Sequence, residues 1–238
     1  MPNLFKPDIK REITKEKTLP DSSDGKECVN TKKESEEPIT EKEYSDIEKW
    51  DEMDLLPEVL RGIYAYGYET PSPIQKKAIQ PMRDGRDLIA QAQSGTGKTA
   101  TFAIGALMTV DTTVRNLQII CVSPTRELTM QISTVFKGLS EFMRDISIET
   151  FVGGCPVNDN IQTIKKNKPH IVIGTPGRVF DLIRRRALYV NGVKQFILDE
   201  ADELLSNGFD EQIKSIFKSL PESVQTWIFS ATLPQHVF

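Results

Sequence analysis

Short runs of apolar residues, rich in branched side chains, recur along the chain from residue 50 onward. Near-continuous runs of this length are typical of strands that are buried on both faces. They predict strands at residues 88–90, 117–122, 146–152, 171–173, 196–198 and 226–229. Segments with a helical spacing of apolar positions lie between them, at residues 71–82, 98–110, 125–139, 178–186 and 210–220. Because strands and helices alternate, the pattern predicts an α/β fold with a mainly parallel sheet sandwiched between helices.

Residues 1–45 have a different character, because Lys, Glu, Ser, Thr and Asp dominate and apolar residues come singly. Such a segment buries too little apolar surface to offset the entropy lost on ordering. We therefore expect a disordered charged tail at 1–45 and one globular domain at 46–238. The tail could be merely solvated, or it could carry a nuclear signal or a partner-binding arm.

Composition and charge narrow the class of protein. The 30 Lys and Arg residues and 34 Asp and Glu residues give a net charge of −4, which excludes a protein that coats nucleic acid by bulk positive charge but allows a local basic groove. The three cysteines are far apart, and the two histidines lack the spacing of zinc ligands. The sequence shows no membrane span and no hydrophobic signal core. We expect a cytoplasmic protein, with the nucleus left open, and no membrane partner.

A glycine-rich segment follows the predicted strand at 88–90 and precedes a predicted helix. Its end fits the phosphate-binding P-loop pattern G-x-x-x-x-G-K-[ST], although Ala92 replaces the first glycine. Lys98 would reach the β- and γ-phosphates of a nucleotide, and the Thr99 hydroxyl would ligate Mg²⁺. A chance glycine turn is the alternative, and the position between strand and helix disfavours it. The predicted phosphate loop consists of Ala92, Gln93, Ser94, Gly95, Thr96, Gly97, Lys98 and Thr99.

An acidic segment directly follows the predicted strand at 196–198. Asp199 would hold Mg²⁺ through water, and Glu200 could orient and deprotonate an attacking water. These acids could instead simply begin a helix, where negative charge is favourable. The P-loop about a hundred residues upstream favours the catalytic interpretation, with Glu200 and Lys98 as catalytic residues.

These residues carry a family resemblance. Residues 199–202 read Asp-Glu-Ala-Asp, the signature of the DEAD-box RNA helicases, and Ala92 is usual in that family's phosphate loop. Further segments that resemble family motifs follow in family order at residues 67–75, 124–131, 153–154, 175–178 and 230–232. The resemblance covers about residues 50–238 and implies a RecA-like P-loop domain. Residues 60–68 and 178–186 resemble the translation initiation factor 4A subfamily, and its exon-junction relative is similar there.

The resemblance implies ATP as substrate with Mg²⁺ as cofactor. Gln75 offers one amide donor and one acceptor, which match N6 and N7 of adenine rather than guanine. Trp50 stands where the family places an aromatic residue that stacks on adenine, and ordinary core packing is the alternative. Tyr68 completes the predicted ATP-binding set.

The resemblance also implies a site for single-stranded RNA. Hydroxyls, glycine amides, helix starts and arginines suit phosphate oxygens, so binding along the backbone would be independent of base sequence. Contacts to 2′-hydroxyls would favour RNA over DNA. The predicted RNA-binding residues are Pro124, Thr125, Arg126, Gly153, Gly154, Thr175, Pro176, Gly177 and Arg178. Asp202, Ser230 and Thr232 are predicted to couple the acidic motif to RNA-dependent domain closure.

The family pattern continues with a second RecA-like domain, which we expect to be absent from this chain. The isolated domain should then hydrolyse ATP very slowly, because the arginines of the second domain are worth roughly 10³–10⁵ in rate. The complete protein would be an ATP-dependent RNA helicase, with scaffold proteins of translation initiation as candidate partners. An ATP-gated RNA clamp of the exon-junction type, another P-loop enzyme such as a DNA translocase or nucleotide kinase, and a pure interaction module are the alternatives.

Overall fold

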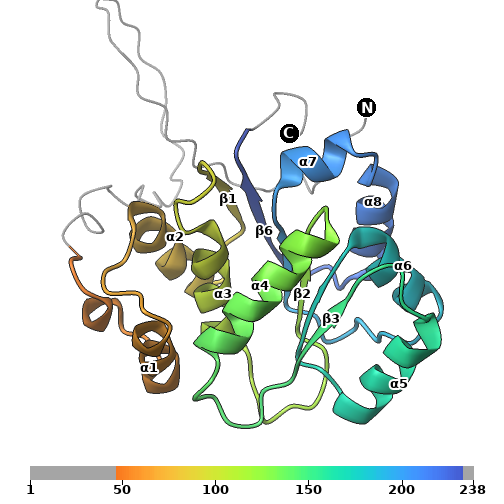
Figure 1. Ribbon diagram of the computed structural model, residues 1–238, viewed down its shortest axis with the longest axis horizontal. Coiled ribbons are helices and arrows are strands. Elements are labelled where there is room, and N and C mark those ends of the chain that lie inside the picture. The colour runs from red at the N-terminus through yellow and green to blue at the C-terminus, as the bar shows by residue number, and fades with distance from the viewer. Residues whose placement is uncertain (1–46, 233–238) are drawn as a thin grey trace, which may run out of the picture.

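Six parallel strands form a single sheet in the order β1-β6-β5-β2-β4-β3. The computed structural model describes residues 47–232, so the predicted tail at 1–45 lies outside the described residues (Figure 1). The strands are β1 (Leu88–Gln91), β2 (Ile119–Val122), β3 (Ile148–Phe151), β4 (Ile171–Gly174), β5 (Gln195–Leu198) and β6 (Gln225–Ser230). Each one overlaps an apolar run in the sequence, and the predicted fold class is confirmed.

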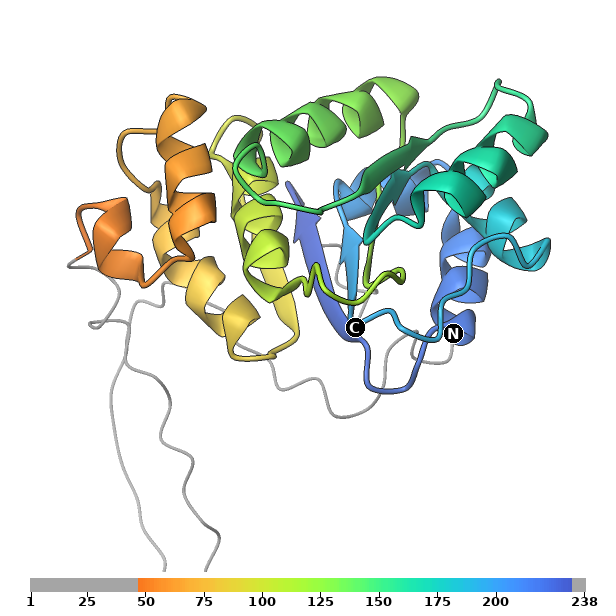
Figure 2. The same ribbon diagram turned by 90° about the horizontal axis from the view of Figure 1, so that it is seen from below.

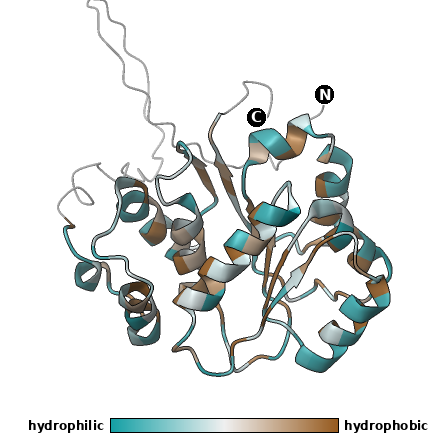
Figure 3. Cartoon of the chain, in the orientation of Figure 1, coloured by the Kyte–Doolittle hydropathy of each residue, from teal (hydrophilic) through white to brown (hydrophobic). Residues whose placement is uncertain are grey.

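Helices cover both faces of this sheet (Figure 2). One face packs against the 3₁₀ helix η1 (Trp50–Met53) and the helices α1 (Pro57–Ala65), α2 (Pro73–Arg83), α3 (Lys98–Thr109) and α4 (Arg126–Leu139). The other face packs against α5 (Val157–Asn167), α6 (Pro176–Arg184), α7 (Ala201–Ser206) and α8 (Asp210–Ser219). Figure 3 shows the hydrophobic strands between these layers.

Alternate strand residues divide between two apolar cores, because side chains of a strand point to opposite faces. In β2, Ile119 and Cys121 pack into the core beneath α1–α4, whereas Ile120 and Val122 pack into the core beneath α5–α8. Both cores therefore need apolar residues at successive positions. This requirement explains why the strands appear in the sequence as continuous apolar runs.

Three helices were not among the predicted helical segments, although a helix start at the acidic residues 199–203 was an alternative and α7 begins there. Helix α1 buries Val59 and Ile63, and α7 buries Ala201 and Leu204 within only six residues. Helix α5 has no fully buried residue, and only Val157, Ile161 and Ile164 pack partly against the core, in an otherwise polar segment. Within residues 47–232, no helix is long and apolar enough to cross a membrane.

All six strands end at one edge of the sheet because they are parallel. We call this the carboxyl edge and divide it into two parts. The β1 side comprises the ends of β1, β6 and β5, and the β3 side comprises the ends of β2, β4 and β3. Strands β5 and β2 are neighbours, so the two sides meet between them. Ligands of open α/β sheets bind at this edge.

Three buried glutamines lie at the opposite, amino edge, next to or at the start of their strands. Gln118 accepts a hydrogen bond from the Asp111 backbone N–H at 2.9 Å and donates to its carbonyl at 2.7 Å. Gln225 donates to the carbonyls of Met82 at 2.9 Å and Arg86 at 2.5 Å, and accepts from Gln195 at 3.4 Å. The amides of Gln118 and Gln225 fix loops that enter the sheet.

Candidate active site and nucleic-acid interface

The predicted phosphate loop connects β1 to α3 at the β1 side. Gly95 and Gly97 adopt φ angles of 83° and 95°, in the left-handed region that favours glycine. Gly97 caps α3, which begins at Lys98. Residues 93–96 are exposed, so their backbone is accessible to a ligand at a helix N-terminus. The local geometry is that of an anion-binding loop.

Lys98 forms an ion pair with Glu200 across the β1 side. Its Nζ lies 3.1 Å and 3.2 Å from the two carboxylate oxygens. The Lys98 side chain is 5% exposed and that of Glu200 is 20% exposed, so the pair is mostly shielded from water. Glu200 has a φ of 49°, which is unfavourable for a side chain with a Cβ atom. The predicted catalytic pair therefore lies together, with each group serving as the other's partner.

Asp199 is nearly buried beside this pair, and its exposed fraction is 4%. Burial, followed by the charge of Glu200, raises the pKa of Asp199 to about 7, although Lys98 opposes the shift. One Asp199 oxygen accepts the Glu200 backbone N–H at 3.1 Å. Two carboxylates and one ammonium thus share a small volume, so one negative charge is left uncompensated when Asp199 is ionised.

The donors near this point suit Mg²⁺. Thr99 supplies a hydroxyl and Asp199 a carboxylate, and Mg²⁺ prefers such oxygen ligands. Among residues 47–232, no group of three or more His, Cys, Asp or Glu side chains could hold a metal by itself. A site with few protein ligands fits Mg²⁺, which usually keeps waters and binds substrate phosphates.

Asp202 joins α7 to the end of β6. Its Oδ2 accepts the Thr232 backbone N–H at 3.0 Å and the Thr232 hydroxyl at 2.7 Å. The Asp202 backbone N–H donates to the Ser230 hydroxyl at 3.2 Å. Although burial acts in the opposite direction, hydrogen bonds from Thr232 and Ser230 lower the pKa of Asp202. The three predicted coupling residues therefore form one network.

Gln75 lies at the third position of α2, as predicted, and is 4% exposed. Its amide oxygen accepts the Ser72 backbone N–H at 2.6 Å, and its amide nitrogen is 3.4 Å from the Gly97 carbonyl oxygen. A Cβ atom at position 97 would lie 2.8 Å from the Gln75 amide nitrogen. Gln75 thus packs directly against the phosphate loop, with its amide engaged inside the protein.

The structure places Trp50 in the core. Its side chain is 0% exposed and belongs to the apolar cluster beneath α1–α4. A ring that stacks on adenine needs an accessible face, so the structure supports the alternative of core packing for Trp50. Tyr68 is half-buried and lies against Tyr66, with ring centroids 5.2 Å apart.

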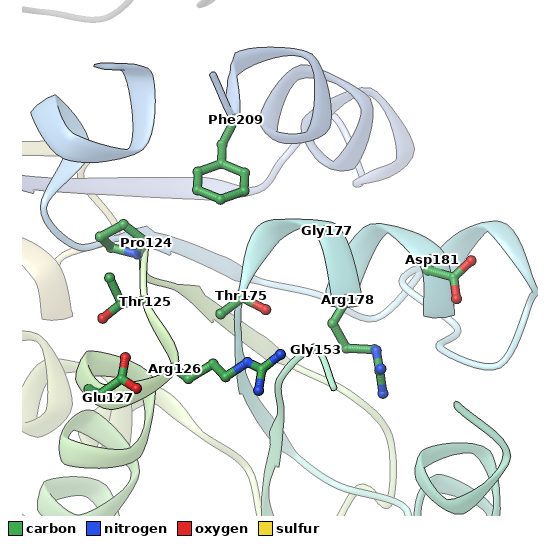
Figure 4. Close-up of a pocket in the computed structure, with 10 residues that line it drawn as sticks. All are labelled: Pro124, Thr125, Arg126, Glu127, Gly153, Thr175, Gly177, Arg178, Asp181 and Phe209. Atoms are coloured by element: carbon green, nitrogen blue, oxygen red, sulfur yellow. The ribbon is translucent and has the colours of Figure 1, made fainter. Parts of the chain in front are cut away.

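The β3 side forms an open hollow of about 660 Å³ (Figure 4). Segments that follow β2, β3 and β4 meet there, although they lie far apart in the sequence. Seven predicted RNA-binding residues and three others line it: Pro124, Thr125, Arg126, Glu127, Gly153, Thr175, Gly177, Arg178, Asp181 and Phe209. The predicted residues Gly154 and Pro176 are not part of this lining, and Pro176 is buried.

Two arginines of the hollow are held differently. Arg178 donates to the Asn160 side chain and, at 2.7 Å, to the Cys155 carbonyl, so its guanidinium is fixed. Arg126 lies over Gly154, where a Cβ atom would be 2.5 Å from its guanidinium nitrogens. Gly154 also has a φ of 91°, so a glycine serves both the turn and the close approach of Arg126.

Two helices begin at the hollow. Thr125 caps α4 and accepts the Leu128 backbone N–H at 3.2 Å, while Thr175 is the N-cap of α6. Helix starts carry a partial positive charge and unpaired N–H groups, which suit phosphate oxygens. Beside two arginines, they offer an anion defined points of contact, although the carboxylates of Glu127 and Asp181 also line the hollow. Glu127, Asp181 and Phe209 were not predicted, and nothing in their sequence spacing distinguishes them from ordinary helix residues.

The DEAD/DEAH box helicase family matches residues 72–238 of the chain. The chain belongs to this family, which agrees with the phosphate loop and acidic motif at the β1 side. Curated relatives have about half of their matched residues in common with it. The ATP-dependent RNA helicase eIF4A of Pyricularia oryzae is 52% identical over 191 residues, which are 80% of this chain and 48% of that protein. The eIF4A of Emericella nidulans is 52% identical over 198 residues, which are 83% of this chain and 49% of that protein.

The chain therefore spans about half the length of the curated relatives that it matches. Solved structures give the same family. A DEAD box protein from the hyperthermophile Methanococcus jannaschii superposes with a TM-score of 0.76 at 34% identity, over 80% of this chain and 52% of that one. Dbp5 of S. cerevisiae, bound to RNA and ADP BeF3, gives a TM-score of 0.71 at 35% identity, over 79% of this chain and 48% of that one. The predicted resemblance to the initiation factor 4A subfamily is confirmed.

Proposed function

We propose that this chain is the ATP-binding RecA-like domain of an ATP-dependent RNA helicase of the initiation factor 4A type. The observation that carries the proposal is the division of the carboxyl edge. A phosphate loop and paired acids occupy the β1 side, and a hollow lined by arginines and helix starts occupies the β3 side. Nucleotide and RNA would therefore bind next to each other on one sheet.

The β1 side binds and positions the nucleotide. The backbone N–H groups of the phosphate loop and the Lys98 ammonium bind the phosphates. When the nucleotide binds, Lys98 leaves the Glu200 carboxylate and contacts a phosphate oxygen instead. Thr99 and Asp199 would hold Mg²⁺, which neutralises phosphate charge when it is bound. Glu200, released from Lys98, orients and deprotonates the attacking water. Gln75 turns one edge of its amide to adenine, which selects ATP over GTP.

The β3 side binds one strand of RNA through its backbone. Thr125, Thr175, Arg126 and Arg178 present hydroxyls, helix starts and guanidinium groups, which contact phosphates without reading bases. The solved Dbp5 complex with RNA, at 35% identity, supports this assignment by similarity. The chain would thus bind RNA independently of sequence.

The complete protein would contain a second RecA-like domain, in line with relatives about twice as long. ATP and RNA would favour a closed arrangement of the two domains, and differential affinity for that state would couple them. Closure around one bent strand would separate a short duplex. The name of the eIF4A relatives supports a role in translation initiation rather than an exon-junction clamp. Scaffold proteins of translation initiation as partners, and a cytoplasmic location, are part of the proposal.

Competition between nucleic acids tests the RNA assignment. We expect a fluorescent single-stranded RNA to bind the chain with an affinity that falls as salt rises, because phosphate contacts displace counterions. Unlabelled RNA should compete better than DNA of equal sequence. Arg178→Ala should reduce the slope of log affinity against log salt concentration by about one, because one phosphate contact is lost. Equal competition by DNA would favour a DNA translocase instead.

Nucleotide binding is tested separately by titration with Mg-ATP and Mg-GTP. We expect measurable binding of ATP and at least tenfold weaker binding of GTP, because a buried amide without its partner costs about 1–3 kcal/mol. Gln75→Glu should weaken ATP binding, since the carboxylate loses the donor that faces N7. Equal affinity for the two nucleotides would contradict the assigned role of Gln75.

A further inference from the structure

An aromatic ring borders the hollow on the β3 side without belonging to any of the predicted RNA-binding segments. Phe209 precedes α8, and its ring points into the hollow toward Pro124 and Thr175 (Figure 4). It is the one aromatic side chain among the lining residues, which otherwise offer charged groups, hydroxyls and backbone. Among the residues that the structure describes, no second aromatic side chain lines the hollow against which the Phe209 ring could stack.

The position of Phe209 is fixed by the local backbone. Its N–H donates to the Leu204 carbonyl at 3.1 Å, and its carbonyl accepts the Ile213 N–H at 2.9 Å. Gly208, with a φ of 76°, makes the turn between α7 and α8. The Phe209 side chain is half-buried and packs partly against the apolar core under α8. The Phe209 side chain therefore contacts the core and also borders the hollow.

The contents of the hollow define what such a ring could contact. A strand whose phosphates lie on Arg178 and on the starts of α4 and α6 carries its ribose and base on the neighbouring side of each nucleotide. These groups present apolar faces, and a base that stacks on an aromatic side chain contributes about 1–3 kcal/mol without dependence on sequence. Phosphate contacts alone would leave the Phe209 face exposed to water.

We infer that Phe209 is an RNA-binding residue that packs its ring against the nucleoside part of a nucleotide held by Arg178 and Thr175. This inference rests on the proposed function of the β3 side as an RNA site. Phe209 is carried by the segment that directly follows Asp199 and Glu200 through α7. The RNA strand would thus touch both the segments after β2 and β4 and the segment that begins at the nucleotide site.

Salt dependence separates this contact from phosphate contacts. The affinity of a fluorescent ten-nucleotide RNA is measured at several KCl concentrations for the parent chain and for Phe209→Leu, Phe209→Tyr and Arg178→Ala. We expect Phe209→Leu to bind about tenfold more weakly at every salt concentration with an unchanged slope. Phe209→Tyr should restore most of the affinity because it keeps the ring. Arg178→Ala should reduce the slope.

Phe180→Leu is the matched control. Phe180 on α6 is also half-buried against the same core but does not line the hollow, so its substitution should leave RNA affinity unchanged. Equal affinity of Phe209→Leu and Phe180→Leu would overturn the inference. Loss of the slope effect in Arg178→Ala, or absence of RNA binding by the parent chain, would instead contradict the proposed function itself.

An RNA with one abasic position, moved along the strand, identifies the part that the ring contacts. If Phe209 packs on a base, removal of that base should cancel the difference between the parent chain and Phe209→Leu at one position. If it packs on ribose, the difference should persist at every position. Mg-ATP affinity, measured in parallel, should remain unchanged in Phe209→Leu and thereby show that the β1 side is intact.

Discussion

The β1 side and the β3 side of the carboxyl edge hold their charged groups in opposite ways. On the β1 side, Lys98 and Glu200 neutralise each other, and Asp202 is tied to Thr232. On the β3 side, Arg126 and Arg178 face an open hollow together with the starts of two helices. Among residues 47–232, no carboxylate forms an ion pair with either of these arginines.

This difference predicts two modes of binding. A nucleotide must replace an internal partner of Lys98, and separating a largely buried ion pair is costly unless a new partner compensates. A strand of RNA can instead dock on groups that already face solvent, with little rearrangement. Substitutions on the β1 side should therefore change ATP hydrolysis and the stability of the protein. Substitutions on the β3 side should change the affinity for RNA and its dependence on salt.

Glu200→Gln should have the largest effect, a loss of about 10²–10⁴ in the rate of ATP hydrolysis. Glutamine cannot accept the proton of the attacking water. Binding of Mg-ATP should persist or become several-fold tighter, because Lys98 no longer has to leave a carboxylate. Single-turnover hydrolysis and nucleotide titration in a protein with both RecA-like domains measure the two effects. Unchanged hydrolysis would remove Glu200 from the role of base.

Lys98→Ala should weaken Mg-ATP binding about 100-fold, because it removes a charged hydrogen-bond donor to phosphate worth about 1.5–3 kcal/mol. RNA affinity at low salt should stay within about twofold, since Lys98 does not line the hollow. Lys77→Ala, at an exposed position of α2, is the control. A parallel loss of RNA affinity would show that the two sides are not separate.

Asp199→Asn should stabilise the nucleotide-free protein at pH 8 by at least about 2 kcal/mol, since a rise of the pKa from 3.8 to about 7 corresponds to about 4 kcal/mol at most. The pKa of Asp199 is about 7 in the folded state, above its ordinary value, so the folded protein binds more protons between about pH 4 and pH 7. Its free energy of unfolding therefore falls as pH rises through this window, and asparagine removes that loss. Urea unfolding at pH 5 and pH 8 tests this.

Glu69→Gln, at an exposed carboxylate, provides the comparison for Asp199→Asn and should change the unfolding free energy little at either pH. The same Asp199→Asn substitution should weaken binding of Mg-ATP. Stability lost at pH 8, rather than gained, would mean that the charge of Asp199 is already compensated in the nucleotide-free protein.

The smallest expected effect lies where the two sides meet. The buried Ser123 hydroxyl, just after β2, is 2.7 Å from the Thr129 hydroxyl, which donates to the Thr125 carbonyl at 2.7 Å. Ser123 therefore donates to Thr129. Thr129→Val should cost about 1–2 kcal/mol by leaving the Ser123 donor unpaired, and Ser123→Ala about 1 kcal/mol. A double-mutant cycle should give a coupling of about 1 kcal/mol, and additive effects would contradict the pairing.

Much of the fold follows from local pattern. The six strands are visible because each must supply apolar side chains to two cores, as Ile119–Val122 does. The approximate site also follows, since residues after parallel strands must gather at one edge. Phe209 could not be located in this way. Its place at the hollow depends on how α7 and α8 pack over the sheet, and no short-range spacing encodes that packing.

The pairing of side chains in the site could not be predicted from the sequence either. Lys98 and Glu200 are 102 positions apart, and their ion pair depends on rotamers and on the left-handed backbone at Glu200. The burial of Trp50 depends on how η1 packs against the helices of its layer. The residue type there fitted both stacking and core packing, and only the position of the ring in space distinguishes them.

The glutamines at the amino edge have a consequence for how the molecule senses its surroundings. Gln118 and Gln225 fix their loops with neutral amides, which do not titrate, and Gln195 donates to Gln225. Asp87 and His170 also accept backbone N–H groups at this edge, from Thr226 and Ser147, so insensitivity to acidity is expected only for the loops that the amides hold. A probe attached near these loops would therefore report global unfolding of the protein. Electrostatic changes caused by ligand binding would be measured at the carboxyl edge instead.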